Sequence, residues 1–159
     1  MRPLDSIILH STATPEGKDY TVDEIRAWHL DRGWADIGYH FVIYRNGAIK
    51  KGRDLGLQGA HTKGRNEGSI GIVYVGGMDA EGIEAKDTRT LQQRVSMRLL
   101  IALLRIKYGI SEVFGHKECS STECPSFDVE ELREKSKYDI LIAYGVIGSL
   151  IWLLVKSLR

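Results

Sequence analysis

Short apolar runs alternate with segments of helical spacing along the chain, a pattern that predicts strands interleaved with helices. The runs are either aliphatic throughout or alternate between apolar and polar side chains, as buried and half-buried strands do. We expect strands over residues 6–9, 39–44, 48–51, 69–75 and 112–114. Asn46-Gly47 separates the second and third of these and predicts a type I′ turn, so these two strands should form a hairpin.

Capping boxes, in which a threonine is followed three residues later by Glu or Gln, mark where two helices begin. Thr21 opens a helix that runs to about residue 31, and Thr90 opens a second one that Gly109 ends. Apolar side chains of the second helix recur at core-facing spacing. They are Met97, Leu100, Ile101, Leu104 and Tyr108. The segment 128–131, Asp-Val-Glu-Glu, predicts the start of a third helix. The whole pattern predicts an α/β fold with a single mixed β-sheet flanked by helices.

Residues 140–155 form a different kind of segment, with sixteen residues and no charge. As a helix it would be roughly 24 Å long, a little short of the ~30 Å hydrocarbon core of a bilayer. A helix packed on the domain is the alternative, but such a helix should be apolar along one stripe rather than on every face. We therefore expect a C-terminal apolar helix over 137–159, transmembrane or membrane-associated, that follows a domain over 1–136.

Composition and charge narrow the class of protein. The chain has 159 residues, which is room for one compact domain and a short appendage. Its 22 basic and 21 acidic side chains leave a formal net charge of +1, so we expect no nucleic-acid partner. The residues before the first strand lack the apolar run of a signal peptide. Two cysteines are too few for a disulfide-rich scaffold.

Two histidines and the cysteines offer the ligands that zinc prefers. His10 ends the first apolar strand, and His116 precedes Cys124 by eight residues. Three protein ligands leave the fourth tetrahedral position for water, which is typical of a catalytic zinc site. Cys119 is a rival sulfur on spacing alone, and the two cysteines could instead pair with each other. Their spacing around a histidine motif favours metal chemistry in a reducing compartment, and hence zinc-dependent hydrolysis.

Four fragments together resemble one family. They are His10-Ser11-Thr12-Ala13-Thr14, Trp34-Ala35-Asp36-Ile37-Gly38-Tyr39-His40-Phe41, Ser69-Ile70-Gly71-Ile72 and Cys124-Pro125-Ser126-Phe127-Asp128. Their order and spacing resemble the zinc-dependent N-acetylmuramoyl-L-alanine amidases of the T7-lysozyme type, which are related to the peptidoglycan recognition proteins. The resemblance covers roughly residues 5–135. It implies a T7-lysozyme-like α/β fold, zinc as cofactor and bacterial peptidoglycan as substrate.

The resemblance also implies roles for individual residues. The family's zinc ligands fall on His10, His116 and Cys124, and its catalytic tyrosine falls on Tyr39, whose hydroxyl would hydrogen-bond the reacting water or the tetrahedral intermediate. Thr122 occupies the position where T7-type enzymes carry an oxyanion-stabilising lysine, although many recognition-protein amidases have threonine there. A hydroxyl donates a neutral hydrogen bond, so the missing charge would cost on the order of 10²-fold in rate if nothing replaced it.

The segment 59–66 matches the family's substrate groove. By this resemblance His61, Lys63 and Asn66 would bind the carboxylates and amides of the muramyl peptide; the alternative is a polar surface loop punctuated by glycine. We expect His29 to be a surface residue and Trp34 to serve in packing rather than as a sugar platform.

The function that the resemblance implies is that of a phage or prophage endolysin. It would cleave the amide between N-acetylmuramic acid and L-alanine of the stem peptide by direct attack of zinc-activated water. Anchored to the inner membrane of the host cell through 140–155, it would act on the periplasmic wall. A non-catalytic peptidoglycan-binding module is one alternative, although such modules typically lack a zinc ligand. A phage regulatory interaction protein is the other, although the arm before His10 is short.

Overall fold

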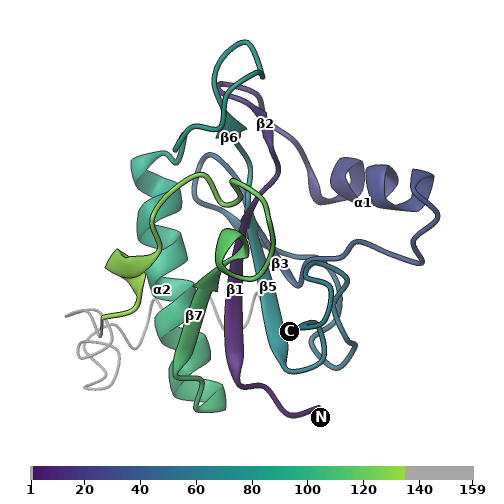
Figure 1. Ribbon diagram of the computed structural model, residues 1–159, viewed down its shortest axis with the longest axis vertical. Coiled ribbons are helices and arrows are strands. Elements are labelled where there is room, and N and C mark those ends of the chain that lie inside the picture. The colour runs from purple at the N-terminus through teal and green to yellow at the C-terminus, as the bar shows by residue number, and fades with distance from the viewer. Residues whose placement is uncertain (1, 135–159) are drawn as a thin grey trace.

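The computed structural model describes residues 2–134 and is built around one five-stranded sheet (Figure 1). Its strand order is β4-β3-β5-β1-β7. The strands are β1 (Ser6–Ser11), β3 (Phe41–Ile43), β4 (Ile49–Lys51), β5 (Ser69–Tyr74) and β7 (Glu112–Gly115). β4 runs antiparallel to β3, whereas the other neighbours are parallel. The predicted mixed α/β sheet is therefore confirmed.

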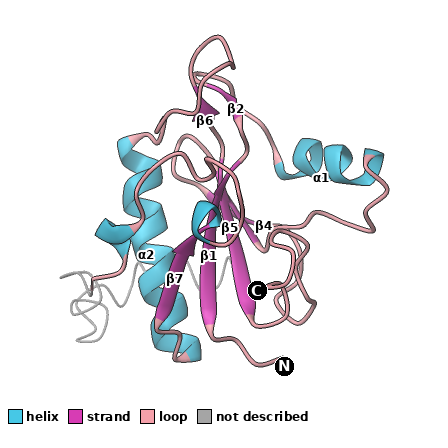
Figure 2. Ribbon diagram, viewed as in Figure 1, coloured by secondary structure: helices cyan, strands magenta, loops and turns pink. Residues whose placement is uncertain are grey.

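The central strands β1 and β5 are buried along their whole length because the sheet is covered on both faces. Side chains of one strand alternate between the faces. Ile72 and Tyr74 of β5 belong to the larger apolar cluster, which also contains the core side chains of α2 (Leu91–Tyr108). Val73 belongs to the other cluster, with Ile25 of α1 (Val22–Asp31). Figure 2 shows the two helices on either side of the strands.

Both helices begin where the capping boxes predict. Thr21 caps α1 by accepting a hydrogen bond from the Glu24 N–H, and Thr90 caps α2 through Gln93 in the same way. Gly109 ends α2 with a φ of 69°, a left-handed conformation that glycine adopts at little cost. For α1 and α2 these local signals predict the helix boundaries correctly.

The hairpin of β3 and β4 is confirmed, but its predicted type I′ turn is wrong. A type I′ turn needs positive φ at both central residues, and of the pair only Gly47 has one, at 84°. The Gly47 N–H donates to the Tyr44 carbonyl at 2.8 Å, and the Asn46 side-chain oxygen accepts from the Ala48 N–H at 2.9 Å. Asn46 thus uses its side chain to close the turn, and glycine takes the left-handed position that follows.

Several smaller elements differ from expectation. A two-residue parallel pair, β2 (Thr14–Pro15) with β6 (Gly77–Met78), is too short to be predicted from the sequence. The predicted third helix is a single 3-10 turn, η2 (Glu130–Leu132), within the described part of the chain. The expected apolar helix over 140–155 lies outside the described residues. Among residues 2–134, no helix has the length and apolar character needed to cross a membrane.

Candidate metal centre

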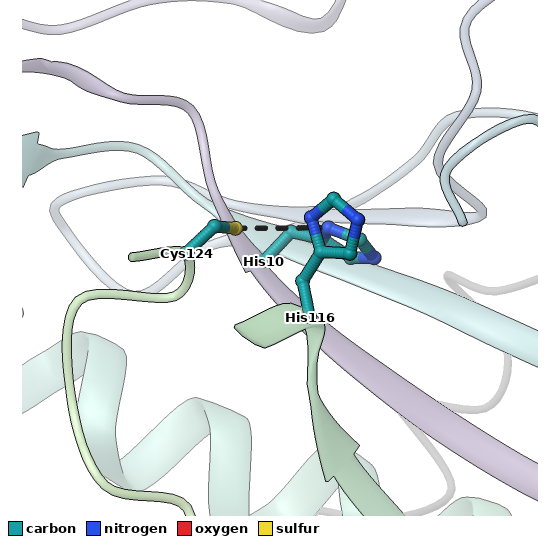
Figure 3. A group of neighbouring side chains, drawn as sticks. All are labelled: His10, His116 and Cys124. Carbon is teal, nitrogen blue, oxygen red and sulfur yellow. Dashed lines mark hydrogen bonds between the residues drawn. The ribbon is translucent and has the colours of Figure 1, made fainter. Parts of the chain in front are cut away.

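The candidate metal centre lies where two parallel strands end side by side. His10 belongs to β1, and His116 directly follows β7 in the 3-10 turn η1 (His116–Glu118). The register pairs Leu9 with Gly115, so the next residue on each strand is one of the two histidines. Cys124 reaches the same place from the loop after η1 (Figure 3). The possible ligand atoms of these three residues all lie within 4.8 Å of one another.

The two histidines are held in the form that binds metal. Burial, together with the nearby His61 and His116, lowers the pKa of His10 well below its usual value of 6.5. Burial also lowers the pKa of His116. Both imidazoles are therefore neutral at pH 7, and each keeps a ring nitrogen with a free lone pair, as a metal ligand must.

The Cys124 sulfur is oriented by the strand beside it. It accepts a hydrogen bond from the Ser11 N–H at 3.2 Å and lies 3.7 Å from Nδ1 of His10. Burial raises the pKa of the thiol, while the contacts with Ser11 act in the opposite direction. A bound cation would complete the stabilisation of the thiolate. Two imidazoles and one thiolate form a donor set that suits zinc and leaves one tetrahedral position open.

The loop that carries Cys124 is tied to the sheet at several points. The Tyr74 hydroxyl donates to the Pro125 carbonyl and the Ser126 hydroxyl to the Gly77 carbonyl, each at 2.9 Å. The Lys117 N–H donates to the Cys124 carbonyl at 2.6 Å. These bonds hold the loop beside η1, so the Cys124 sulfur lies close to His116.

Cys119, the rival sulfur, lies outside this group. Its N–H donates to the His116 carbonyl at 2.9 Å, which closes the η1 turn, and its side chain is half-buried. Both cysteines are free thiols, so they do not pair with each other. The arrangement places Cys124, rather than Cys119, beside the two histidines.

Tyr39 and Thr122 border the three candidate ligands. The centroid of the Tyr39 ring lies 5.1 Å from that of His10. Burial, together with the charge of a Cys124 thiolate, raises the pKa of Tyr39, so its hydroxyl stays protonated at neutral pH. Thr122 is exposed, and its hydroxyl oxygen accepts from the Cys124 N–H at 3.3 Å. Because that oxygen accepts, its own proton is free to be donated elsewhere.

Comparison with known proteins settles the family. The family model described as N-acetylmuramoyl-L-alanine amidase matches residues 1–127. The chain belongs to this amidase family. The endolysin of Escherichia phage T7 is 41% identical to the amidase over 134 residues, which cover 84% of this chain and 87% of the relative. The endolysin of Klebsiella phage KP32 is 39% identical over 131 residues, covering 82% and 86%.

Solved structures agree with this assignment. The amidase matches the N-acetylmuramoyl-L-alanine amidase LysC from Clostridium intestinale with a TM-score of 0.72 at 34% identity, over 83% of this chain and 84% of that one. It matches Drosophila PGRP-LB with a TM-score of 0.66 at 30% identity, over 79% and 76%. The predicted resemblance to T7-type amidases and to the recognition proteins is confirmed.

The three residues expected in the amidase's substrate groove occupy different environments. Lys63 is exposed. Asn66 turns its side-chain oxygen inward, where it accepts from the N–H groups of His61 and Thr62 at 2.9 and 2.8 Å. His61 is 8% exposed, and its Nδ1 lies 3.1 Å from Nε2 of His10. Asn66 thus shapes the loop, and His61 contacts a candidate ligand.

The expectation that His29 is a surface residue is wrong, because it is buried on the inner side of α1. Its Nδ1 accepts from the Gly38 N–H at 3.0 Å. Its ring stacks on Trp34, with centroids 4.5 Å apart, and lies 5.4 Å from Tyr39. Burial, followed by nearby arginines, lowers the pKa of His29 to about 4. The sequence signal for this burial is that His29 lies four residues after the apolar Ile25, which places both on the same face of the helix.

Sequence reasoning also missed Glu118, which holds the turn that presents His116. Its carboxylate accepts from the Gly115 N–H at 2.6 Å and forms an ion pair with Arg133. The signal was an acidic residue three positions after a strand end, the spacing of a capping interaction.

Proposed function

We propose that this amidase is an endolysin-type peptidoglycan hydrolase that cleaves the amide between N-acetylmuramic acid and L-alanine of the stem peptide. The observation that carries the proposal is the convergence of His10, His116 and Cys124, whose ligand atoms lie within 4.8 Å of one another. Membership of the amidase family and the phage endolysins among its relatives support the reaction and the setting.

Zinc would be held by a ring nitrogen of His10, a ring nitrogen of His116 and the sulfur of Cys124. When bound, it supplies a Lewis acid that polarises the scissile carbonyl and lowers the pKa of water. The chain's own part is to present neutral imidazoles and a thiolate at one edge of the sheet. The hydrogen bonds that Cys124 accepts from the N–H groups of Ser11 and Lys117 keep that geometry before substrate arrives.

Tyr39 and Thr122 would stabilise the charge that develops on the substrate carbonyl oxygen. The raised pKa of Tyr39 keeps its hydroxyl a donor, and a donor aimed at a developing oxyanion lowers the barrier of acyl transfer. The Thr122 hydroxyl, whose oxygen already accepts from the Cys124 N–H, has one proton left to donate. Neither group carries a charge, so the metal would supply most of the electrostatic stabilisation.

Substrate would bind along the loop that contains His61, Lys63 and Asn66. Lys63 is exposed and offers a cation for a carboxylate of the stem peptide. Asn66, through its bonds to the N–H groups of His61 and Thr62, fixes the course of the loop. The contribution of Asn66 and His61 to substrate binding would then be mainly the shape of the groove wall.

The amidase domain would occupy residues 1–136, with residues 137–159 attached to the inner membrane of the host cell. The uncharged run over 140–155 supports this attachment. Membrane fractionation with protease protection tests it, with a chain ended after residue 136 as control. The full chain is expected in the membrane fraction and the shortened one in the soluble fraction. A full chain that stays wholly soluble would refute the anchor.

Digestion of purified peptidoglycan tests the reaction. The full chain should release new L-alanine amino termini and no new reducing sugar ends, because an amidase spares the glycan. New reducing ends would indicate a glycosidase. Tight wall binding without new termini would instead make the protein a recognition module. The feature that favours this alternative is threonine, rather than lysine, at position 122.

A further inference from the structure

The two ring nitrogens of His10 face different neighbours. Nδ1 faces the Cys124 sulfur at 3.7 Å, on the side of the candidate ligands. Nε2 faces away from it, 3.1 Å from Nδ1 of His61. We propose that His61 is a positioning residue: with Ser69 it forms a directed hydrogen-bond chain that fixes His10 in the tautomer and orientation that bind zinc. This inference rests on the zinc site of the proposed function.

The direction of the chain follows from its far end. A backbone carbonyl only accepts, so the Ser69 hydroxyl donates its proton to the Arg65 carbonyl, 2.5 Å away. The Ser69 oxygen then accepts from Nε2 of His61, at 3.4 Å. A neutral His61 that carries its proton on Nε2 must accept at Nδ1, and the donor there is Nε2–H of His10. His10 is left with an unprotonated Nδ1 that faces Cys124, the tautomer that ligates through Nδ1.

Two neighbouring glycines fix the plane of the His61 ring. A Cβ atom at Gly71 would lie 2.4 Å from Cδ2 of His61, and one at Gly59 would lie 2.5 Å from the same atom. The imidazole therefore fills the space that these two glycines leave open. The backbone N–H of His61 donates to the side-chain oxygen of Asn66 at 2.9 Å, and His61 is almost inaccessible to solvent. Its polar atoms thus act inward, toward His10 and Ser69.

Thr62 provides a secondary contact in the same cluster. Its hydroxyl lies 3.1 Å from Nδ1 of His61 and 3.4 Å from Nε2 of His10. Nδ1 of His61 has a single lone pair, so the Thr62 hydroxyl competes with Nε2–H of His10 for it, and its oxygen can accept a weak share of the His10 proton. The shorter distance to His61 makes the imidazole the main acceptor for His10.

The zinc affinity of the full chain, measured by competition with a chromophoric chelator, tests the proposal. His61→Leu should weaken zinc binding by about 10- to 100-fold, the effect typical of a lost outer partner of a metal-binding histidine. His61→Asn, whose amide oxygen can replace Nδ1 as acceptor, should recover most of the affinity. Ser69→Ala should weaken binding in the same direction by less. Thermal unfolding of the zinc-free variants controls for loss of fold.

Nitrogen NMR of the zinc-free protein reads the tautomer of His10 directly. Wild type and His61→Asn should show a single Nε2–H tautomer, and His61→Leu and Ser69→Ala a mixture, which a merely structural role of His61 would not produce. If His61→Leu binds zinc as tightly as wild type and keeps the same His10 tautomer, this inference is overturned while the proposed function stands. If His61→Leu fails to fold, the same result in Ser69→Ala overturns it. A folded wild-type chain that binds no zinc would instead overturn the proposed function and this inference with it.

Discussion

The sulfur of Cys124 lies 3.7 Å from Nδ1 of His10, although the two residues are 114 positions apart in the chain. Two features of the fold make this contact. Parallel pairing of β1 with β7 brings the ends of both strands to one edge of the sheet. The loop after η1 is then returned to that edge by the bonds of Lys117 and Tyr74. The candidate centre is therefore a product of the tertiary fold and not of any single motif.

Tyr39→Phe should separate catalysis from metal binding. It removes one hydroxyl donor at the reacting oxygen and leaves the three candidate ligands in place, so kcat should fall by about 10²- to 10³-fold while zinc affinity stays unchanged. Cleavage of a soluble muramyl peptide, with zinc competition in parallel, measures both. Tyr20→Phe is the matched control, since the Tyr20 ring packs against Trp28 whereas the Tyr39 ring packs against His10. Full activity of Tyr39→Phe would remove Tyr39 from the mechanism.

Thr122→Lys should raise turnover. A charge-assisted donor at this exposed position would restore the stabilisation that a neutral hydroxyl lacks, so kcat should rise by up to the order of 10²-fold. Ser121→Lys adds the same charge one residue away and should leave kcat unchanged, which separates a directed hydrogen bond from a general field. Equal gains in both variants would contradict a specific role for position 122.

Asp87→Asn should destabilise the fold through Arg89. The Arg89 side chain is 2% exposed, lies 3.2 Å from the Phe127 ring centroid, and is paired with Asp87 at 2.9 Å and Glu131 at 3.2 Å. With one of its two partners neutral, the buried guanidinium is under-compensated, so the free energy of unfolding should fall by about 2–3 kcal/mol. Urea unfolding measures the change, and Glu81→Gln, on an exposed loop, should show little change.

The ion pair between Asp87 and Arg89 should also make the stability of the fold depend on pH. Burial acts to raise the pKa of Asp87, but the hydrogen bonds and charges of Arg89 and Arg94 outweigh it, and the net pKa is lowered. A lowered carboxyl pKa stabilises the fold above the unfolded value of about 3.9 and loses that stabilisation as the pH falls through the folded value. The difference between wild type and Asp87→Asn should therefore shrink below about pH 4. A difference that widens in acid would contradict the assignment.

Local signals in the sequence were sufficient for most of the fold. The capping residues Thr21 and Thr90 and the terminating Gly109 are decided within a few positions, and the structure confirms all three. The turn at Asn46-Gly47 was mispredicted because one dipeptide fits several turn types, and the choice depends on whether the Asn46 side chain closes the turn.

The candidate site depends more heavily on contacts between distant segments. Spacing alone leaves Cys119 and Cys124 as rivals, and at the level of the sequence only the family resemblance separates them. His61 sits in a glycine-rich loop that resembles a polar surface. Its burial requires the space beside Gly71, which belongs to β5, the strand that follows this loop. No local pattern encodes such a contact, so its role beside His10 emerges only in three dimensions.

The central claim is that zinc held by His10, His116 and Cys124 drives amide cleavage. Its most direct test is the cleavage rate of zinc-free full chain as zinc is added in steps, for wild type and for Cys124→Ala. We predict that the wild-type rate rises from near zero and levels off at about one equivalent of zinc, as for a single tight site, whereas the variant stays inactive at stoichiometric zinc. Full activity of zinc-free wild type, or of Cys124→Ala at one equivalent, would contradict the account.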